Sequence, residues 1–223
     1  MAVPGKESLE MQKIHEARKA IGAALDALVR MNSKANPEVR VAALEALSET
    51  AVDIETHVRN AMQDRDELVR TTAVELAGEQ RLVNLKQEIV RRFRSDRSWL
   101  VRSAAAVALG DLGLPDARTP LLERIERSCE EERVRIYYAL VRLGGRKFLK
   151  PFLEGLNDPF YRIRCATANL LPALVVKSDR RRIVKLLTDA LHGEQTDAAR
   201  SSLRNALEQI GDDRGGDNLL ASS

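Results

Sequence analysis

The sequence predicts an all-α protein, an α-solenoid of about six helical hairpins, and three observations support that prediction. Only 4% of the 223 residues are aromatic while 44% are hydrophobic, so the core must consist mainly of Ala, Leu, Val and Ile. A short motif recurs about every 32 residues, which is typical of repeat architectures. Within each copy, apolar residues are spaced for one face of a helix.

Each copy of the motif is anchored on one position near the start of a helix. The anchors are Arg40, Arg70, Arg102, Ile136, Arg164 and Arg200, and Ile136 is the departure from arginine. Small or apolar residues stand one place before, three places after and seven places after most anchors, as Val69, Ala73 and Ala77 do around Arg70. These positions share one helix row, so the helix that carries the anchor is expected to bury a single stripe.

The ends of these helices are also marked in the sequence. Eight places after the anchors stand Gly78, Gly110, Gly144 and Pro172, which we interpret as helix C-termini. An acid stands six places before five anchors, at Asp64, Asp96, Glu130, Asp158 and Glu194, where the positive end of the next helix favours a carboxylate. Amphipathic runs at 9–30, 51–63, 82–94, 119–129, 147–156 and 179–192 predict the other helix of each hairpin.

The pattern Asp-x-x-x-x-Val-Arg-x-x-Ala with a trailing Ala-Leu-Gly, clearest from Asp96 to Gly110, resembles the HEAT repeat, in particular its short bacterial, PBS-lyase-like form. The resemblance covers residues 34–210 and implies a superhelix whose second helices line the concave face. It does not specify an activity, because HEAT-like arrays serve as scaffolds, bilin lyases, DNA glycosylases and toxin-neutralising proteins. We expect a solenoid over 9–210 between a flexible N-terminus (1–8) and a flexible C-terminal tail (211–223).

No assembled catalytic or metal-binding set is evident in the sequence, so we predict a non-enzymatic protein without cofactor or metal. The three histidines, His15, His57 and His192, fall in the first helices of different repeats. Cys129 and Cys165 lie one repeat apart, without the short spacings of a zinc site. The di-iron hydroxylases among HEAT-like proteins use several His-Glu pairs, and this chain has one, His15-Glu16.

The charge is nearly balanced, with 36 basic and 33 acidic residues, but the basic residues form two blocks. The candidate basic patches are Arg91, Arg92 and Arg94 in one block, and Arg180, Arg181, Arg182 and Lys185 in the other. An uncharged strip on the second helices is the candidate for binding a partner protein, because Trp and Tyr are enriched in binding hot spots. That strip comprises Trp99, Val107, Tyr137 and Val141, and its alternative role is core packing between repeats.

We therefore predict a cytoplasmic protein-interaction module, an adaptor, assembly factor or inhibitor, that binds a partner protein on its concave surface as a monomer or weak homodimer. Two cysteines without a disulfide framework and the lack of an apolar run near 18 residues favour this compartment and exclude a membrane span. One alternative is a nucleic-acid-binding or DNA-glycosylase-like protein that uses the basic blocks, with Trp99 and Asp96 as its nearest constellation. A bilin-lyase-like chaperone is another.

Overall fold

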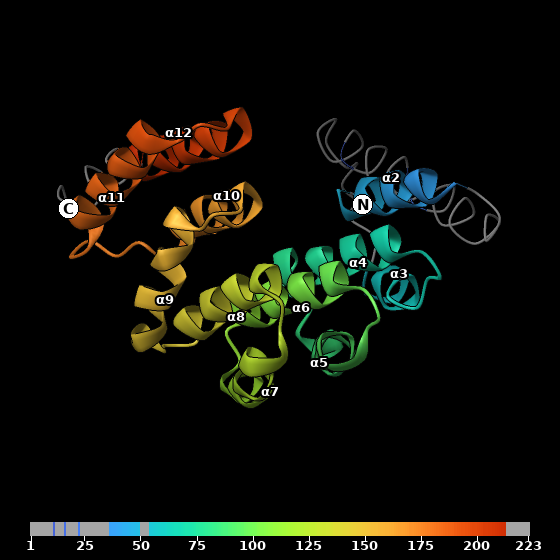
Figure 1. Ribbon diagram of the computed structural model, residues 1–223. Helices are drawn as coiled ribbons and strands as arrows, with labels where there is room; N and C mark the ends of the chain where they lie inside the picture. The colour runs from blue at the N-terminus through green and yellow to red at the C-terminus, as the bar shows by residue number, and fades with distance from the viewer. Residues whose placement is uncertain (1–10, 12–15, 17–21, 23–35, 50–53, 213–223) are drawn as a thin grey trace, which may run out of the picture. The chain divides into compact units, whose positions relative to one another are not determined.

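The computed structural model describes residues 11, 16, 22, 36–49 and 54–212, and the elements in this part of the chain are helices joined by turns (Figure 1). The all-α prediction is therefore confirmed. The chain divides into two compact units, Met1–Leu112 and Gly113–Ser223. None of the described helices is both long and apolar enough to cross a membrane.

The described residues of the first unit form two complete helical hairpins and one further helix. The hairpins pair α3 (Glu55–Ala61) with α4 (Glu67–Glu79), and α5 (Lys86–Ser95) with α6 (Trp99–Leu112). The further helix is α2 (Pro37–Ser48), which begins at a proline behind Asn36, whose side chain accepts a hydrogen bond from the Glu38 amide. The helix α4 packs against α2 and against α6, so the second helices of successive repeats are direct neighbours.

In the second unit, residues 113–212 form three hairpins. They pair α7 (Arg118–Arg124) with α8 (Glu130–Arg142), α9 (Leu149–Glu154) with α10 (Tyr161–Leu170), and α11 (Arg180–Gly193) with α12 (Asp197–Asp212). Short 3₁₀ turns extend the brief first helices at Pro115–Ala117, Ile125–Arg127, Arg146–Phe148 and Gly155–Asn157, and Leu171–Leu174 follows α10. The helix α10 contacts α8 and α12, which repeats the packing order of the first unit.

The predicted apolar stripe forms the core. In α4 the stripe residues Val69, Ala73 and Ala77 are at most 2% exposed. The small residues in this stripe let neighbouring helices approach closely, and one close approach is at Gly78, where an added Cβ would lie 2.9 Å from the Cα and Cβ atoms of Ala108 in α6. Gly78 therefore serves helix–helix contact.

The prediction that this glycine ends the helix is wrong for Gly78 and Gly110. The helix α4 continues to Glu79, and α6 continues to Leu112. In these two repeats a positive φ angle falls slightly later, at Arg81 (51°) and Gly113 (67°), whereas Gly144 itself has a φ of 83° and lies just past the end of α8. Two of these three residues are glycines, which adopt such backbone angles without steric cost.

The structure also corrects the fourth anchor from Ile136 to Arg133. Gly144 follows Arg133 by the same eleven places that separate Arg81 from Arg70 and Gly113 from Arg102. The stripe around Arg133 comprises Glu132, Ile136 and Leu140, all of which are 0% exposed. Ile136 is thus a core residue, and a buried glutamate, which pairs with Arg124 of α7, stands where most other repeats have valine or isoleucine.

The predicted segment boundaries are described only in part. The expected tail 1–8 and nearly all of the first predicted helix, 9–30, lie outside the described residues, as do residues 213–223 of the expected C-terminal tail. The helix α12 runs to Asp212, two residues past the predicted end of the solenoid at 210.

Candidate binding site

Three of the anchor arginines each connect their own repeat to the next through a bidentate ion pair. The Nε and Nη2 atoms of Arg70 each donate to one carboxylate oxygen of Asp96 at 2.9 Å. Arg40 donates in the same way to Asp64 at 3.0 and 2.9 Å, and Arg164 donates to Glu194 at 2.7 and 2.8 Å. In each pair the acid is the one that stands six places before the following anchor. We call this series the arginine ladder and each pair a rung.

Each acid of a rung also organises the turn in which it stands. The Asp96 carboxylate accepts a hydrogen bond from the Ser98 amide at 3.0 Å, and Glu194 accepts one from the Thr196 amide at 2.8 Å. Arg70 additionally donates from Nη1 to the Asp64 carbonyl at 2.8 Å. One buried arginine therefore joins two consecutive turns, which explains why this position recurs in the sequence.

These contacts lower the pKa of the rung carboxylates. Burial alone raises the pKa of Asp96, but hydrogen bonds from Arg70 and from the Ser98 amide bring it below its ordinary value. For Glu194, the hydrogen bond from Arg164 has the largest effect and places the pKa far below the usual range, against an opposing effect of burial. Both carboxylates are thus ionised in the folded protein at neutral pH.

Glu194→Gln tests this linkage by changing how stability depends on pH. A carboxylate with a depressed pKa stabilises the fold above the pKa of the unfolded chain, and this contribution is lost as the pH falls below it. We expect Glu194→Gln to be less stable than wild type at pH 7. The difference in free energy of unfolding between the two proteins is expected to narrow between about pH 5 and pH 2. Urea denaturation across this range measures the gap. A gap that stays constant, as expected for the exposed control Glu208→Gln, would contradict the linkage.

One rung is open in the second unit. Arg133 takes the anchor position, and Asp158 stands six places before the next anchor, Arg164. In the described part of the chain, no hydrogen bond or ion pair joins Arg133 to Asp158. The Nη2 atom of Arg133 donates to the Ser128 carbonyl at 2.9 Å, but its Nε is buried without a partner. In the three closed rungs, Nε is an atom that donates to the acid.

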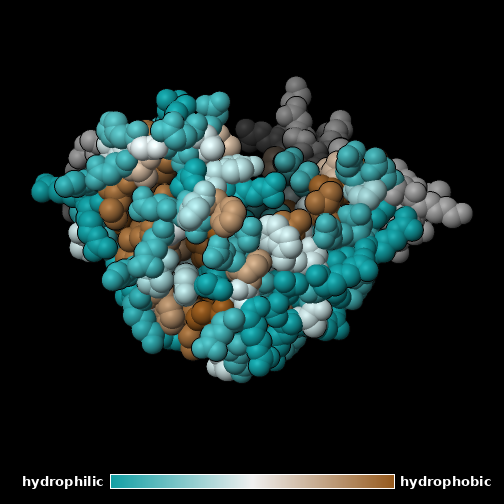
Figure 2. All heavy atoms as spheres, viewed as in Figure 1, coloured by the Kyte–Doolittle hydropathy of each residue, from teal (hydrophilic) through white to brown (hydrophobic). Residues whose placement is uncertain are grey.

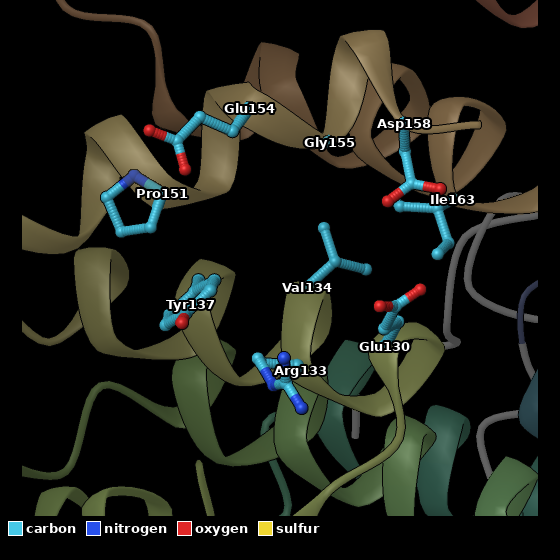
Figure 3. A pocket seen from close by; sticks show the side chains of 9 residues that line it. All are labelled: Glu130, Arg133, Val134, Tyr137, Pro151, Glu154, Gly155, Asp158 and Ile163. Atoms are coloured by element: carbon cyan, nitrogen blue, oxygen red, sulfur yellow. The ribbon is translucent and has the colours of Figure 1, made fainter. Parts of the chain in front are cut away.

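A cavity of about 210 Å³ lies at the open rung (Figure 3). Its lining residues come from α8, α9 and the start of α10: Glu130, Arg133, Val134, Tyr137, Pro151, Glu154, Gly155, Asp158 and Ile163. The acidic first turn of α8 suits the positive end of that helix, and the helical spacing of Glu130, Arg133 and Tyr137 places them on one face. Figure 3 shows α8 on one side of the cavity and Pro151 and Glu154 on the other.

Negative charge predominates in this cavity. Glu130, Glu154 and Asp158 contribute carboxylates and Arg133 contributes the one guanidinium among the lining residues. Within the described residues no ion pair joins these carboxylates to a basic side chain, and Arg164 interacts electrostatically with Asp158. Asp158 uses one oxygen to accept a hydrogen bond from the Phe160 amide at 2.8 Å, which fixes its side chain at the start of α10. Tyr137 stacks on Phe148, with ring centroids 6.2 Å apart and planes at 19°. The site therefore presents one anchored carboxylate, Asp158, two exposed carboxylates and a tyrosine ring that stacks on Phe148.

The predicted partner-binding strip is divided between the two units. Trp99 and Val107 are half-buried on α6, and Tyr137 is half-buried on α8. Val141 is 6% exposed and belongs to the core of its unit, so it is not available to a partner. Of the four residues, Tyr137 is the one that lines the cavity.

Two of the predicted basic residues have structural contacts inside their own units. Arg92 pairs with Asp96 at 3.2 Å, and Arg180 donates to the carbonyl of Ile210 at the end of the chain's last described helix. The other candidates are exposed, namely Arg91, Arg94, Arg181, Arg182 and Lys185. Figure 2 shows a face on which polar residues predominate, with apolar residues scattered among them. Such scattered exposure is ordinary for a folded chain.

The residues that could contribute to catalysis are dispersed or occupied. His57 is buried in α3 and His192 is exposed in α11, while His15 lies outside the described residues. Among the described residues, no group of three or more His, Cys, Asp or Glu side chains is arranged to hold a metal ion. Asp96, the acid paired with Trp99 in the glycosylase-like alternative, uses its carboxylate in the Arg70 rung and is 6% exposed.

Sequence reasoning missed Arg133 and the cavity beside it. A signal was available, because Arg133 lies 31 residues after Arg102 and 31 before Arg164, more regular than the spacings that Ile136 gives. The buried Glu132 concealed it, since a charged residue stands where the pattern requires an apolar one.

Comparison with known proteins agrees with this repeat structure. Residues 54–141 match the family model described as HEAT repeats. No curated protein sequence matches the chain. Among solved structures, human deoxyhypusine hydroxylase in complex with glycerol aligns with a TM-score of 0.46 and 16% identity, over 92% of this chain and 99% of that chain. Residues 54–141 are therefore similar to HEAT repeats, and the described helical hairpins have the fold class of an α-solenoid.

Proposed function

We propose that this protein is a non-enzymatic interaction module that holds a partner protein against α8, with Tyr137 as an anchor. The observation that carries the proposal is the open rung, where an aromatic ring and several unpaired carboxylates line a cavity that opens to solvent. Tyrosine supplies a large contact area with little conformational entropy to lose, and it is enriched in hot spots. A helical repeat scaffold commonly provides such extended binding surfaces.

A protein fits this site better than a nucleic acid does. Phosphate groups require basic side chains, but carboxylates outnumber guanidinium groups in the cavity. The ion pair of Arg92 with Asp96 also reduces the positive charge that the first basic block offers, and the Arg180 guanidinium is engaged with the Ile210 carbonyl. We therefore favour an adaptor, assembly factor or inhibitor over a DNA-binding protein. The free cysteines Cys129 and Cys165 favour a reducing, cytoplasmic location.

Tyr137→Ala is expected to weaken partner binding about 30-fold, the effect of losing a hot-spot residue worth about 2 kcal/mol. The tagged wild-type protein and the variant are used for affinity capture from native lysate, with and without nuclease, and the co-eluting proteins are quantified by mass spectrometry. The affinity of the recovered partner is then measured for both by calorimetry. Tyr161→Ala is the matched control, because Tyr161 is 40% exposed on α10 and does not line the cavity.

The expected result is a stoichiometric protein that survives nuclease, persists in the Tyr161→Ala sample and is depleted in the Tyr137→Ala sample. Recovery of nucleic acid alone, lost on nuclease treatment, would replace the proposal with the basic-patch alternative. Equal recovery in both tyrosine variants would retain a protein partner but remove it from α8.

A further inference from the structure

We infer that a pocket in the first unit binds a dianionic phosphate group through arginine side chains. The pocket lies at the closed rung of Arg70 and Asp96, between the turn before α4 and the end of α5, and its volume is about 410 Å³. Three arginines that do not belong to the ladder line it, namely Arg65, Arg92 and Arg97. We call it the arginine pocket. It is a second site, distinct from the cavity at α8 on which the proposed function rests.

The carboxylates of the arginine pocket already have partners. Asp96 binds Arg70 through both oxygens, and one of them accepts a further hydrogen bond from Arg92 at 3.2 Å. Asp64, the other lining acid, binds Arg40, which lies outside the pocket. The four lining guanidinium groups exceed these two carboxylates by two positive charges. The pocket therefore attracts an anion.

The acids at the start of α4 do not cancel this surplus. Asp66 and Glu67 follow Arg65 in the sequence but do not line the pocket. Asp66 uses its carboxylate to cap α4, where it accepts a hydrogen bond from the Leu68 amide at 2.9 Å. Glu67 is exposed, so solvent screens its charge. Counted together with Arg40, the two acids still leave the region around the pocket with a net positive charge.

The three additional arginines keep donors for a ligand. The Nε of Arg92 is buried without a hydrogen-bond partner, while its two Nη atoms donate to Asp96 and Gln63. Arg97 donates from Nη2 to the Arg65 carbonyl at 2.7 Å. In the described part of the chain, the Arg65 guanidinium makes no hydrogen bond. A buried N–H without an acceptor costs free energy, so the pocket favours a ligand that brings acceptor oxygens.

The comparable rung of Arg164 and Glu194 in the second unit closes without such arginines. Its two hydrogen bonds are 2.7 and 2.8 Å long. A pocket of about 320 Å³ lies beside it, but carboxylates outnumber guanidinium groups in its lining. The positions equivalent to Arg65, Arg92 and Arg97 are held there by Pro159, Ala190 and Gln195. The ladder forms without the three arginines, so a ligand explains their presence better than the fold does.

Phosphate fits the arginine pocket better than a carboxylate or a phosphodiester does. A phosphate monoester carries a charge between about −1.5 and −2 at neutral pH and has three strong acceptor oxygens. Guanidinium groups bind such oxygens at two points each. A carboxylate and a nucleic-acid phosphodiester each carry a single charge, so either one compensates only part of the surplus. Free phosphate and a phosphorylated side chain share the chemistry that the pocket recognises.

The test is an NMR titration of the full chain with N-acetyl-O-phospho-L-serine N-methylamide at constant ionic strength. We expect saturable shifts, with a dissociation constant in the millimolar range, at the amides of Arg65 and Arg97 but not at Gln195. Arg92→Ala, which introduces the residue type of position 190, and Arg65→Gln are each expected to weaken binding about ten-fold. Arg91→Gln is the matched control, because Arg91 is exposed in the same basic block and does not line the pocket. The same spectra report whether each variant is folded.

Three further probes identify the anion and its source. Inorganic phosphate that binds at least as tightly as the phosphoserine probe indicates the free ion, and weaker binding indicates a phosphorylated side chain; either result supports the inference. N-acetyl-L-aspartate N-methylamide is expected to bind about ten-fold more weakly, and equal or tighter binding would overturn the inference. A DNA duplex whose affinity falls equally with Arg91→Gln and Arg65→Gln would assign the surface to nucleic acid instead. Absence of saturable shifts, or shifts that survive both pocket variants, would overturn the inference as well.

Discussion

Asp96→Ala is expected to lower the free energy of unfolding by about 3–5 kcal/mol, the largest effect that we expect from a single substitution in this chain. The substitution leaves the guanidinium of Arg70, which is 3% exposed, without its bidentate partner. It also removes the acceptor for the Ser98 amide at the start of α6. Urea denaturation at neutral pH, followed by circular dichroism, measures the loss.

The matched control is Asp197→Ala, since Asp197 pairs with Arg200 at 3.0 Å but its side chain is 98% exposed. We expect this control to cost about 0.5 kcal/mol or less. The double variant Arg70→Met with Asp96→Leu should recover much of the loss, because it removes both buried charges together. A cost below about 1 kcal/mol for Asp96→Ala would show that the ladder does not stabilise the repeats as described.

Gly78→Ala is expected to destabilise the first unit by about 1–3 kcal/mol, although alanine is the better helix former. The added Cβ would lie 2.9 Å from both Cα and Cβ of Ala108, so one helix must move away from the other. Because a backbone atom blocks the position, no side-chain rotation relieves the overlap. The melting temperature and the urea midpoint of the variant check this result.

Gly193→Ala is the comparison for this substitution. Gly193 ends α11, and a Cβ added there meets nothing within 4 Å. We expect this variant to be as stable as wild type or slightly more stable, because only the helix propensity changes. If Gly78→Ala were also neutral, the close packing of α4 on α6 would not be the reason for the glycine.

The fold could be predicted from the sequence because its signals are local and repeated. The spacing of Val69, Ala73 and Ala77 around Arg70 follows from helix geometry alone, and the same spacing locates most of the other anchors. The fourth anchor is displaced by three residues in the sequence pattern because Glu132 is charged. Its burial is made possible by Arg124 of the preceding helix, a tertiary contact that no periodicity reveals.

The candidate site was predictable only in part. Tyr137 is identifiable from its residue type on a second helix, and the structure places it in the cavity wall. The sequence predicts that the acids six places before the anchors lie at helix starts, and Asp96 and Glu194 do accept hydrogen bonds from backbone amides there. It does not predict that the same carboxylates bind the anchor arginine of the preceding repeat. The sequence contains both members of this rung, Arg133 and Asp158. Whether they pair depends on the conformation of the Arg133 side chain, which the sequence pattern does not predict.

The measurement that tests the central claim most directly is site-specific photo-crosslinking in the native cell extract. Tyr137 is replaced by p-benzoylphenylalanine, an aromatic of similar shape, and the same probe at Leu122, which is 41% exposed on α7 and outside the cavity, is the comparison. We predict a discrete protein adduct from position 137, and none of that adduct from position 122. An identical adduct from both positions, or none from position 137 while a partner is still captured, would contradict the claim.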